Sequence, residues 1–144
     1  MPGSKRLLMT LGALSVAANM LASCMTEPVA VPPPAEPRTV ATTPVALTAQ
    51  QISVIQRGIK DSLKDPGSAQ FGEMKAGKDS AGEITVCGYV NAKNSFGGYT
   101  GRKPFVGSIA PGAKAFIVAG MGGTDIETRA VFMVCKQYGI DLML

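Results

Sequence analysis

Residues 86–105 read VCGYVNAKNSFGGYTGRKPF and combine a strand pattern, a polar turn and a second extended run. From residue 83 to residue 91 the side chains alternate, which predicts a strand. One side of it carries Ile84, Val86, Gly88 and Val90, and the other carries Thr85, Cys87, Tyr89 and Asn91. The Asn and Gly residues that follow predict a tight loop. Residues 99–109 predict a second strand, in which Pro104 indicates an edge position or a bulge.

Two helices are predicted on either side of this hairpin in the chain. Thr48 and Gln51 have capping-box spacing, and so do Thr124 and Glu127. Apolar residues then recur at helical spacing, first at Ile52, Ile55, Ile59 and Leu63, and later at Ile126, Ala130, Val131, Val134, Cys135 and Tyr138. Residues 130–135 also suit a strand, but the marked ends, with Gly139 at the second, favour a helix.

Together with short extended segments at 68–74 and 115–119, these elements predict an α+β domain over residues 47–144. It consists of an N-terminal helix, a small and mostly antiparallel sheet of about four strands, and a C-terminal helix. Residues 120–123 are expected to be a flexible joint before that helix.

The first two dozen residues have the order of an export signal. Residues 1–6 are basic, and residues 7–21 are mostly apolar but short for a membrane span, which needs about 20 residues. The sequence Leu21-Ala22-Ser23-Cys24 resembles the lipobox of bacterial lipoprotein precursors. The resemblance implies a signal peptide over residues 1–23 and a diacylglycerol with fatty acyl chains such as palmitate on Cys24. An ordinary secretory signal, with Cys24 incidental, is the alternative.

Residues 24–46 are predicted to be a Pro-rich tether. The prolines in this segment exclude a helix or a central strand, and polyproline II conformation extends by about 3.1 Å per residue. By resemblance to lipoproteins, Met25 after the Cys favours the outer membrane, with the domain in the periplasm and the inner membrane as the alternative. The expected partners are the membrane, through the lipid anchor, and an envelope protein or peptidoglycan.

If Cys24 carries lipid, Cys87 and Cys135 remain as a pair in an oxidising compartment, and a disulfide between them is predicted. A redox or metal site is the alternative, but no CxxC spacing supports it. The chain also contains no His, which removes the usual general base and the commonest metal ligand. We therefore expect no enzyme, no cofactor and no metal, although a lysine or a carboxylate with a shifted pKa could still act as a base.

The charge of the chain argues against nucleic acid as a partner. The formal charge is +4, but Lys5 and Arg6 lie in the signal segment, so 12 basic and 10 acidic residues remain. A formal charge of +2 is small compared with the clustered basic surfaces of nucleic-acid-binding proteins.

The loop between the two central strands is the candidate binding site. Its amide, aromatic and cationic residues suit an anion and a stacked ring, and they are Asn91, Lys93, Asn94, Phe96, Tyr99, Arg102 and Lys103. A glycine-rich hairpin whose aromatic residues pack locally is the structural alternative. The pattern from residue 65 to residue 105 also resembles small uncharacterised exported proteins of Gram-negative bacteria, a resemblance that implies no activity.

The sequence thus predicts a membrane-anchored periplasmic lipoprotein with a binding or scaffolding role in the cell envelope. Two other classes remain open. One is a periplasmic inhibitor of a hydrolase, similar to lysozyme inhibitors, although their inhibitory motif is not found. The other is a peptidoglycan-acting enzyme, for which no base is identified.

Overall fold

The computed structural model describes residues 39–142. The signal peptide predicted for residues 1–23, the lipidation predicted at Cys24 and the predicted tether as far as residue 38 lie outside the described residues.

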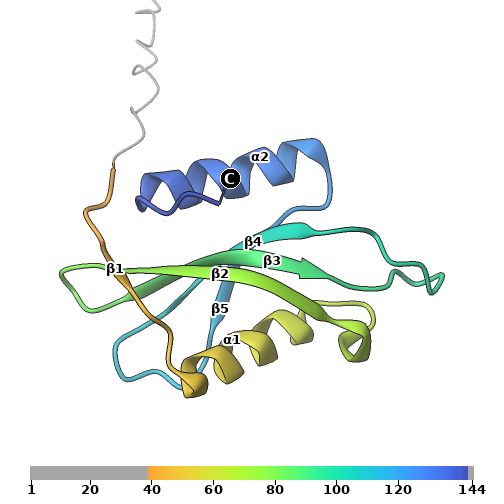
Figure 1. Ribbon diagram of the computed structural model, residues 1–144, viewed down its shortest axis with the longest axis horizontal. Coiled ribbons are helices and arrows are strands. Elements are labelled where there is room, and N and C mark those ends of the chain that lie inside the picture. The colour runs from red at the N-terminus through yellow and green to blue at the C-terminus, as the bar shows by residue number, and fades with distance from the viewer. Residues whose placement is uncertain (1–38, 143–144) are drawn as a thin grey trace, which may run out of the picture. The chain divides into compact units, whose positions relative to one another are not determined.

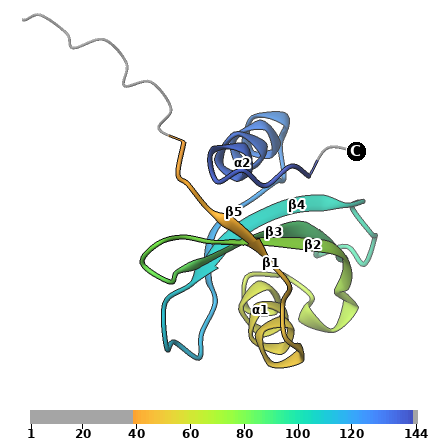
Figure 2. The same cartoon turned by 60° about the vertical axis from the view of Figure 1, so that its left-hand side comes forward.

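One antiparallel sheet of five strands forms the middle layer of the domain (Figure 1). The strands follow one another in sequence order: β1 (Thr43–Val45), β2 (Gln70–Lys78), β3 (Ile84–Asn91), β4 (Lys103–Ile109) and β5 (Ile117–Met121). The helix α1 (Ala49–Asp61) covers one face of the sheet, and α2 (Asp125–Gln137) covers the other (Figure 2). A short 3-10 helix, η1 (Pro66–Ser68), connects α1 to β2.

The α+β architecture predicted from the sequence is confirmed, with five strands instead of about four. The additional strand is β1, which lies in the segment assigned to the tether and pairs with the end of β2, Thr43 opposite Lys78. Pro44 is tolerated there because β1 is an edge strand and one side of its backbone needs no partner. The folded domain therefore begins before residue 47.

The edge position inferred from Pro104 is wrong, because β4 lies between β3 and β5. Pro104 of β4 lies one residue beyond the last β4–β5 pair, Phe105 with Met121. Its carbonyl accepts a hydrogen bond from the N–H of Gly122 at 2.7 Å. The proline has no N–H to donate in return, so only one bond of that pair forms. The irregularity in this ladder lies two residues later, between Val106 and Gly107.

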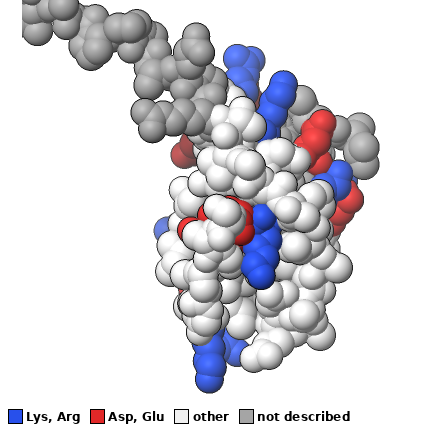
Figure 3. Space-filling view, turned by 90° about the vertical axis from the view of Figure 1, so that its left-hand side faces the viewer, with Lys and Arg blue, Asp and Glu red and all other residues white. Residues whose placement is uncertain are grey.

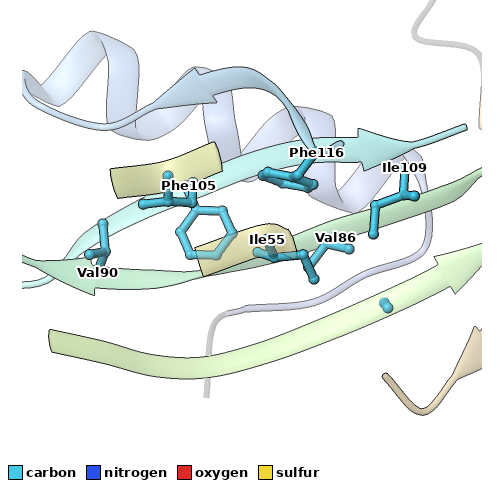
Figure 4. Packing of buried hydrophobic residues seen from close by; sticks show 8 residues of the cluster. Ile55, Val86, Val90, Phe105, Ile109 and Phe116 are labelled. Carbon is cyan, nitrogen blue, oxygen red and sulfur yellow. The ribbon is translucent and has the colours of Figure 1, made fainter. Parts of the chain in front are cut away.

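The face of the sheet under α1 holds the larger hydrophobic core (Figure 4). Ile55 and Ile59 of α1 are fully buried against Val86 and other apolar residues of the strands. The Phe105 and Phe116 rings meet edge to face, with centroids 6.2 Å apart. Both buried isoleucines belong to the helical pattern predicted from the sequence. At about 25 cal/mol per Å² of buried apolar surface, this contact accounts for much of the stability of α1.

The opposite face of the sheet packs against α2. Cys87 of β3 forms a disulfide with Cys135 of α2, as predicted, with the two Cα atoms 6.1 Å apart. Val106 and Val131 pack beside the bridge, and the chain after α2 returns over the same face with Ile140 buried. The disulfide therefore fastens the second helix to the central strand within a small core.

Both predicted capping boxes are present. The Thr48 and Thr124 hydroxyls each accept a hydrogen bond from the backbone N–H of the third helical residue. The side-chain oxygen of that residue in turn accepts a hydrogen bond from the backbone N–H of the threonine. Residues 130–135 are helical, so the alternative strand is wrong. Ile126, predicted on the packed side of this helix, is 81% exposed, because it projects from the first turn away from the sheet.

Two boundaries near the C-terminus also differ from prediction. The strand expected at 115–119 is β5, two residues later, and Gly120 and Met121 of the expected flexible joint belong to it. Phe116 is buried before the strand begins.

The disulfide encloses 48 residue steps, so replacing both Cys87 and Cys135 with Ala should lower the free energy of unfolding by about 4 kcal/mol. Urea unfolding followed by circular dichroism measures the difference. Reduced wild-type protein is the control, and it should lose a similar amount. A loss below about 1 kcal/mol in the double variant would contradict this role of the bridge.

Gly107 leaves no room for a side chain, because a Cβ there would overlap the Phe116 ring and the carbonyl oxygen of Ile117. Gly107→Ala should therefore destabilise the domain by about 2 kcal/mol, as overpacked cores do. Gly98→Ala is the matched control, since the nearest atom to its Cβ lies 3.8 Å away. We expect it to change stability by less than about 0.5 kcal/mol in the same unfolding assay. Equal effects of the two substitutions would show that the packing at Gly107 is looser than described.

Candidate functional site

The candidate site lies in the hairpin that connects β3 to β4, which extends beyond the helices at one end of the sheet (Figure 1). Asn94 organises its tip. Its side-chain oxygen accepts hydrogen bonds from the N–H groups of Phe96 at 3.0 Å and Gly98 at 3.1 Å, and its own N–H donates to the Gly98 carbonyl. Gly97 adopts a φ of 81°, which glycine reaches without strain. Three hydrogen bonds and the positive φ of Gly97 thus define the shape of this loop.

Phe96 projects from the tip and is 96% exposed. An aromatic side chain in that position adds almost nothing to the stability of the fold, because it buries almost none of its surface. The structural alternative, in which the aromatic residues of the loop pack locally, is therefore wrong for Phe96. It holds in part for Tyr99, which is 48% exposed and whose hydroxyl accepts a hydrogen bond from Gln70.

The base of the hairpin is attached to the rest of the domain. The N–H of Lys93 donates to the Ser68 hydroxyl at 2.8 Å, and that hydroxyl donates to the Asp65 carbonyl. Asn91 donates to the Gln70 side chain on β2, although its own oxygen is buried without a hydrogen-bond partner. Through its bond to Gln70, Asn91 joins the end of β3 to β2, which is a structural role.

The three predicted cationic residues do not gather in one place. Lys93 lies over the Tyr99 ring, 5.5 Å from its centroid. Arg102 stacks on the Tyr89 ring at 4.4 Å, and Tyr89 belongs to the face of the sheet that α2 covers. Neighbouring residues of an extended chain point to opposite faces, so Lys103 lies on the α1 side instead. Arg102 is therefore separated from the other two.

On the α1 side, Lys93 and Lys103 meet a third lysine that the sequence did not single out. Lys64, just after α1, lines the same hollow of about 160 Å³. Its floor includes Val90 and Ala92, and Asn94 also contributes to the wall. Lys64 was missed because it lies far from the hairpin in sequence, and only the position of α1 under the sheet brings it there.

Acidic residues are absent from the hairpin and from the lining of this hollow. The sequence has no Asp or Glu between Glu83 and Asp125. The opposite end of the domain differs, because basic and acidic side chains lie side by side there on a mainly uncharged surface (Figure 3). The cationic character is thus local to the hairpin end.

A larger hollow of about 520 Å³ lies between the start of α1 and the turns after β2 and β4. Only two cationic residues, Lys78 and Lys114, line it, and the hairpin does not reach it. We therefore regard the hollow at the hairpin as the better-defined site, because three cations from three segments surround a small volume.

The described residues contain no group of three or more His, Cys, Asp or Glu side chains placed to hold a metal ion. Neither α1 nor α2 is long and apolar enough to cross a membrane.

Comparison with known proteins found no match: no family model, no curated protein and no solved structure resembles the chain closely enough to be significant.

Proposed function

We propose that this chain is a lipid-anchored envelope protein that binds a partner protein through the β3–β4 hairpin and holds it near the membrane. The exposed Phe96 on a hydrogen-bonded turn is the observation that carries the proposal. The anchor is inferred from the lipobox-like sequence at Leu21-Ala22-Ser23-Cys24.

Phe96 has the properties of an interface anchor. Large aromatic side chains that enter a pocket on a partner supply much of the binding free energy in protein complexes. The turn around Asn94 holds the backbone of Phe96 in place before any contact is made, so little conformational entropy is lost on binding. A rigid and exposed phenylalanine is therefore suited to enter an apolar pocket.

The direction of the hairpin also supports the proposal. The chain enters the sheet at β1, which pairs with the end of β2 at Lys78, next to the β2–β3 turn. The hairpin leaves from the other end of β3, eight residues away, or roughly 25 Å at the rise of an antiparallel strand. A domain held from its N-terminal side would thus present Phe96 at the end remote from its attachment.

If the lipobox-like sequence is processed, intact-protein mass spectrometry of membrane fractions should show a chain that begins at Cys24 and carries acyl groups. Globomycin, which blocks the lipoprotein signal peptidase, should cause the unprocessed precursor to accumulate. Cys24→Ser is the control and should remove both effects. A chain released without lipid, or processing that is insensitive to globomycin, would refute the anchor.

A photo-crosslinking phenylalanine analogue at position 96 of the full-length protein, expressed in cells, should yield one dominant adduct on irradiation, identifiable by mass spectrometry. The analogue at position 114 is the matched control, because Lys114 is exposed in the loop at the other end of β4. We expect no such adduct there.

Once a partner is identified in this way, the Phe96→Ala protein can compete with the crosslinking variant for it. We expect Phe96→Ala to bind the partner roughly tenfold more weakly than wild type does, since anchor residues contribute 1 kcal/mol or more. Adducts of equal yield at positions 96 and 114 would refute the hairpin as the binding surface. If the only adducts contained muropeptides, the proposed partner would be peptidoglycan and not a protein.

A further inference from the structure

We infer that the hollow lined by Lys64, Lys93 and Lys103 is a binding site for a phosphate group. This inference goes beyond the proposed function, because it needs neither the lipid anchor nor a protein partner of Phe96.

The first argument is the concentration of positive charge. The three lysines come from separate segments: the chain after α1, the hairpin and the start of β4. The fold brings these three residues into the lining of one hollow of about 160 Å³, although the Lys93 ammonium group also lies 5.5 Å from the centroid of the Tyr99 ring. Like charges in such a small space repel one another, and an anion between them replaces that repulsion with attraction.

The second argument is that no acidic side chain neutralises this charge within the hollow. Its lining contains no Asp or Glu. Asp61 and Asp65 flank Lys64 at a short distance in the chain, but neither lines the hollow. The one salt bridge found among residues 39–142, between Lys75 and Glu73, involves none of the three lysines.

The third argument concerns the other polar groups of the wall. The hydroxyls of Ser62 and Thr100 already donate to the backbone carbonyls of Gly58 and Ala92. The polar side-chain groups of the wall that remain are the lysines and the side-chain nitrogen of Asn94, whose oxygen is occupied. All of them are hydrogen-bond donors.

These donors fit phosphate better than a carboxylate. A carboxylate has one charge and two oxygens, whereas a phosphate monoester carries close to two charges on three oxygens near neutral pH. Three separate ammonium groups, each a compact point charge with rotatable donors, can each contact a different oxygen. The phosphate is inorganic or belongs to a lipid whose headgroup is a phosphate monoester, since these two sources share this chemistry.

The test is isothermal titration calorimetry of inorganic phosphate into the full-length protein in a nonionic detergent at low ionic strength. We expect saturable binding of one phosphate, which weakens as salt is added. Lys64→Gln/Lys103→Gln should reduce the affinity roughly tenfold or more, because each charge-assisted hydrogen bond contributes on the order of 1.5 kcal/mol or above.

Lys114→Gln/Lys136→Gln is the matched control, because it removes two exposed charges outside the hollow. It should change the affinity by less than about threefold, as exposed distant charges contribute little. Without phosphate, the Lys64→Gln/Lys103→Gln protein should unfold at the same temperature as wild type or above it, since a repulsion has been removed. That measurement separates lost binding from lost folding. Phe96→Ala should bind phosphate as wild type does, which distinguishes this site from the partner surface.

Three further titrations decide the ligand class and source. Acetate should bind at least roughly tenfold more weakly than phosphate, and equal binding would overturn the assignment to phosphate. Short-chain phosphatidic acid, whose headgroup is a phosphate monoester, is kept below its micelle concentration. It assigns the group to a lipid headgroup if it binds more tightly than phosphate and depends on the lysines. Short-chain phosphatidylcholine that binds equally, without dependence on the lysines, would overturn the proposal. The proposal would also be overturned if neither phosphate nor phosphatidic acid bound.

Discussion

The alternation of side chains along β3 is the constraint on which the other elements depend. Val86 and Val90 point to the face that α1 covers, and Cys87 and Tyr89 point to the face that α2 covers. A strand of this kind needs an apolar layer on both sides, so each helix has a defined face to cover. The Cys87–Cys135 disulfide fixes the smaller of the two cores, where few large side chains are available. Both faces of the sheet are thereby committed to packing, and binding groups are left to its ends.

Signals that act within a few residues allowed the helices to be predicted from the sequence. The capping boxes at Thr48 and Thr124 mark both helix starts, because a cap satisfies backbone N–H groups three residues away. The disulfide followed from the number of cysteines once Cys24 was set aside. The strand β1 was missed because its pairing partner lies more than thirty residues away and Pro44 reads as part of the tether. Three residues carry too little pattern to reveal such a pairing.

The sequence predicted most of the residues of the candidate site but not how their side chains are arranged in space. Asn94, Phe96 and Lys93 lie together in the hairpin, as expected from their proximity in sequence. Grouping Arg102 with Lys103 overlooked the period of two, which sends adjacent side chains to opposite faces of an extended chain. That separation was available from the sequence. The contribution of Lys64 was not, because it depends on where the end of α1 meets the sheet.

Each of the two features of the hairpin lowers the stability of the fold, and this cost supports the proposals that both take part in binding. Exposing Phe96 forgoes the burial of a large side chain, which would stabilise the fold by roughly 1.5–3 kcal/mol. Placing Lys64, Lys93 and Lys103 around one hollow adds repulsion that a single acidic residue in its lining would relieve. The turn itself requires neither arrangement, since its hydrogen bonds involve the Asn94 side chain and backbone groups, and its positive φ lies at Gly97. An apolar anchor and a cationic hollow lie at one end of the sheet. Phe96 buries almost none of its surface, and the lining of the hollow contains no Asp or Glu. Their complements are therefore to be sought in a ligand or partner.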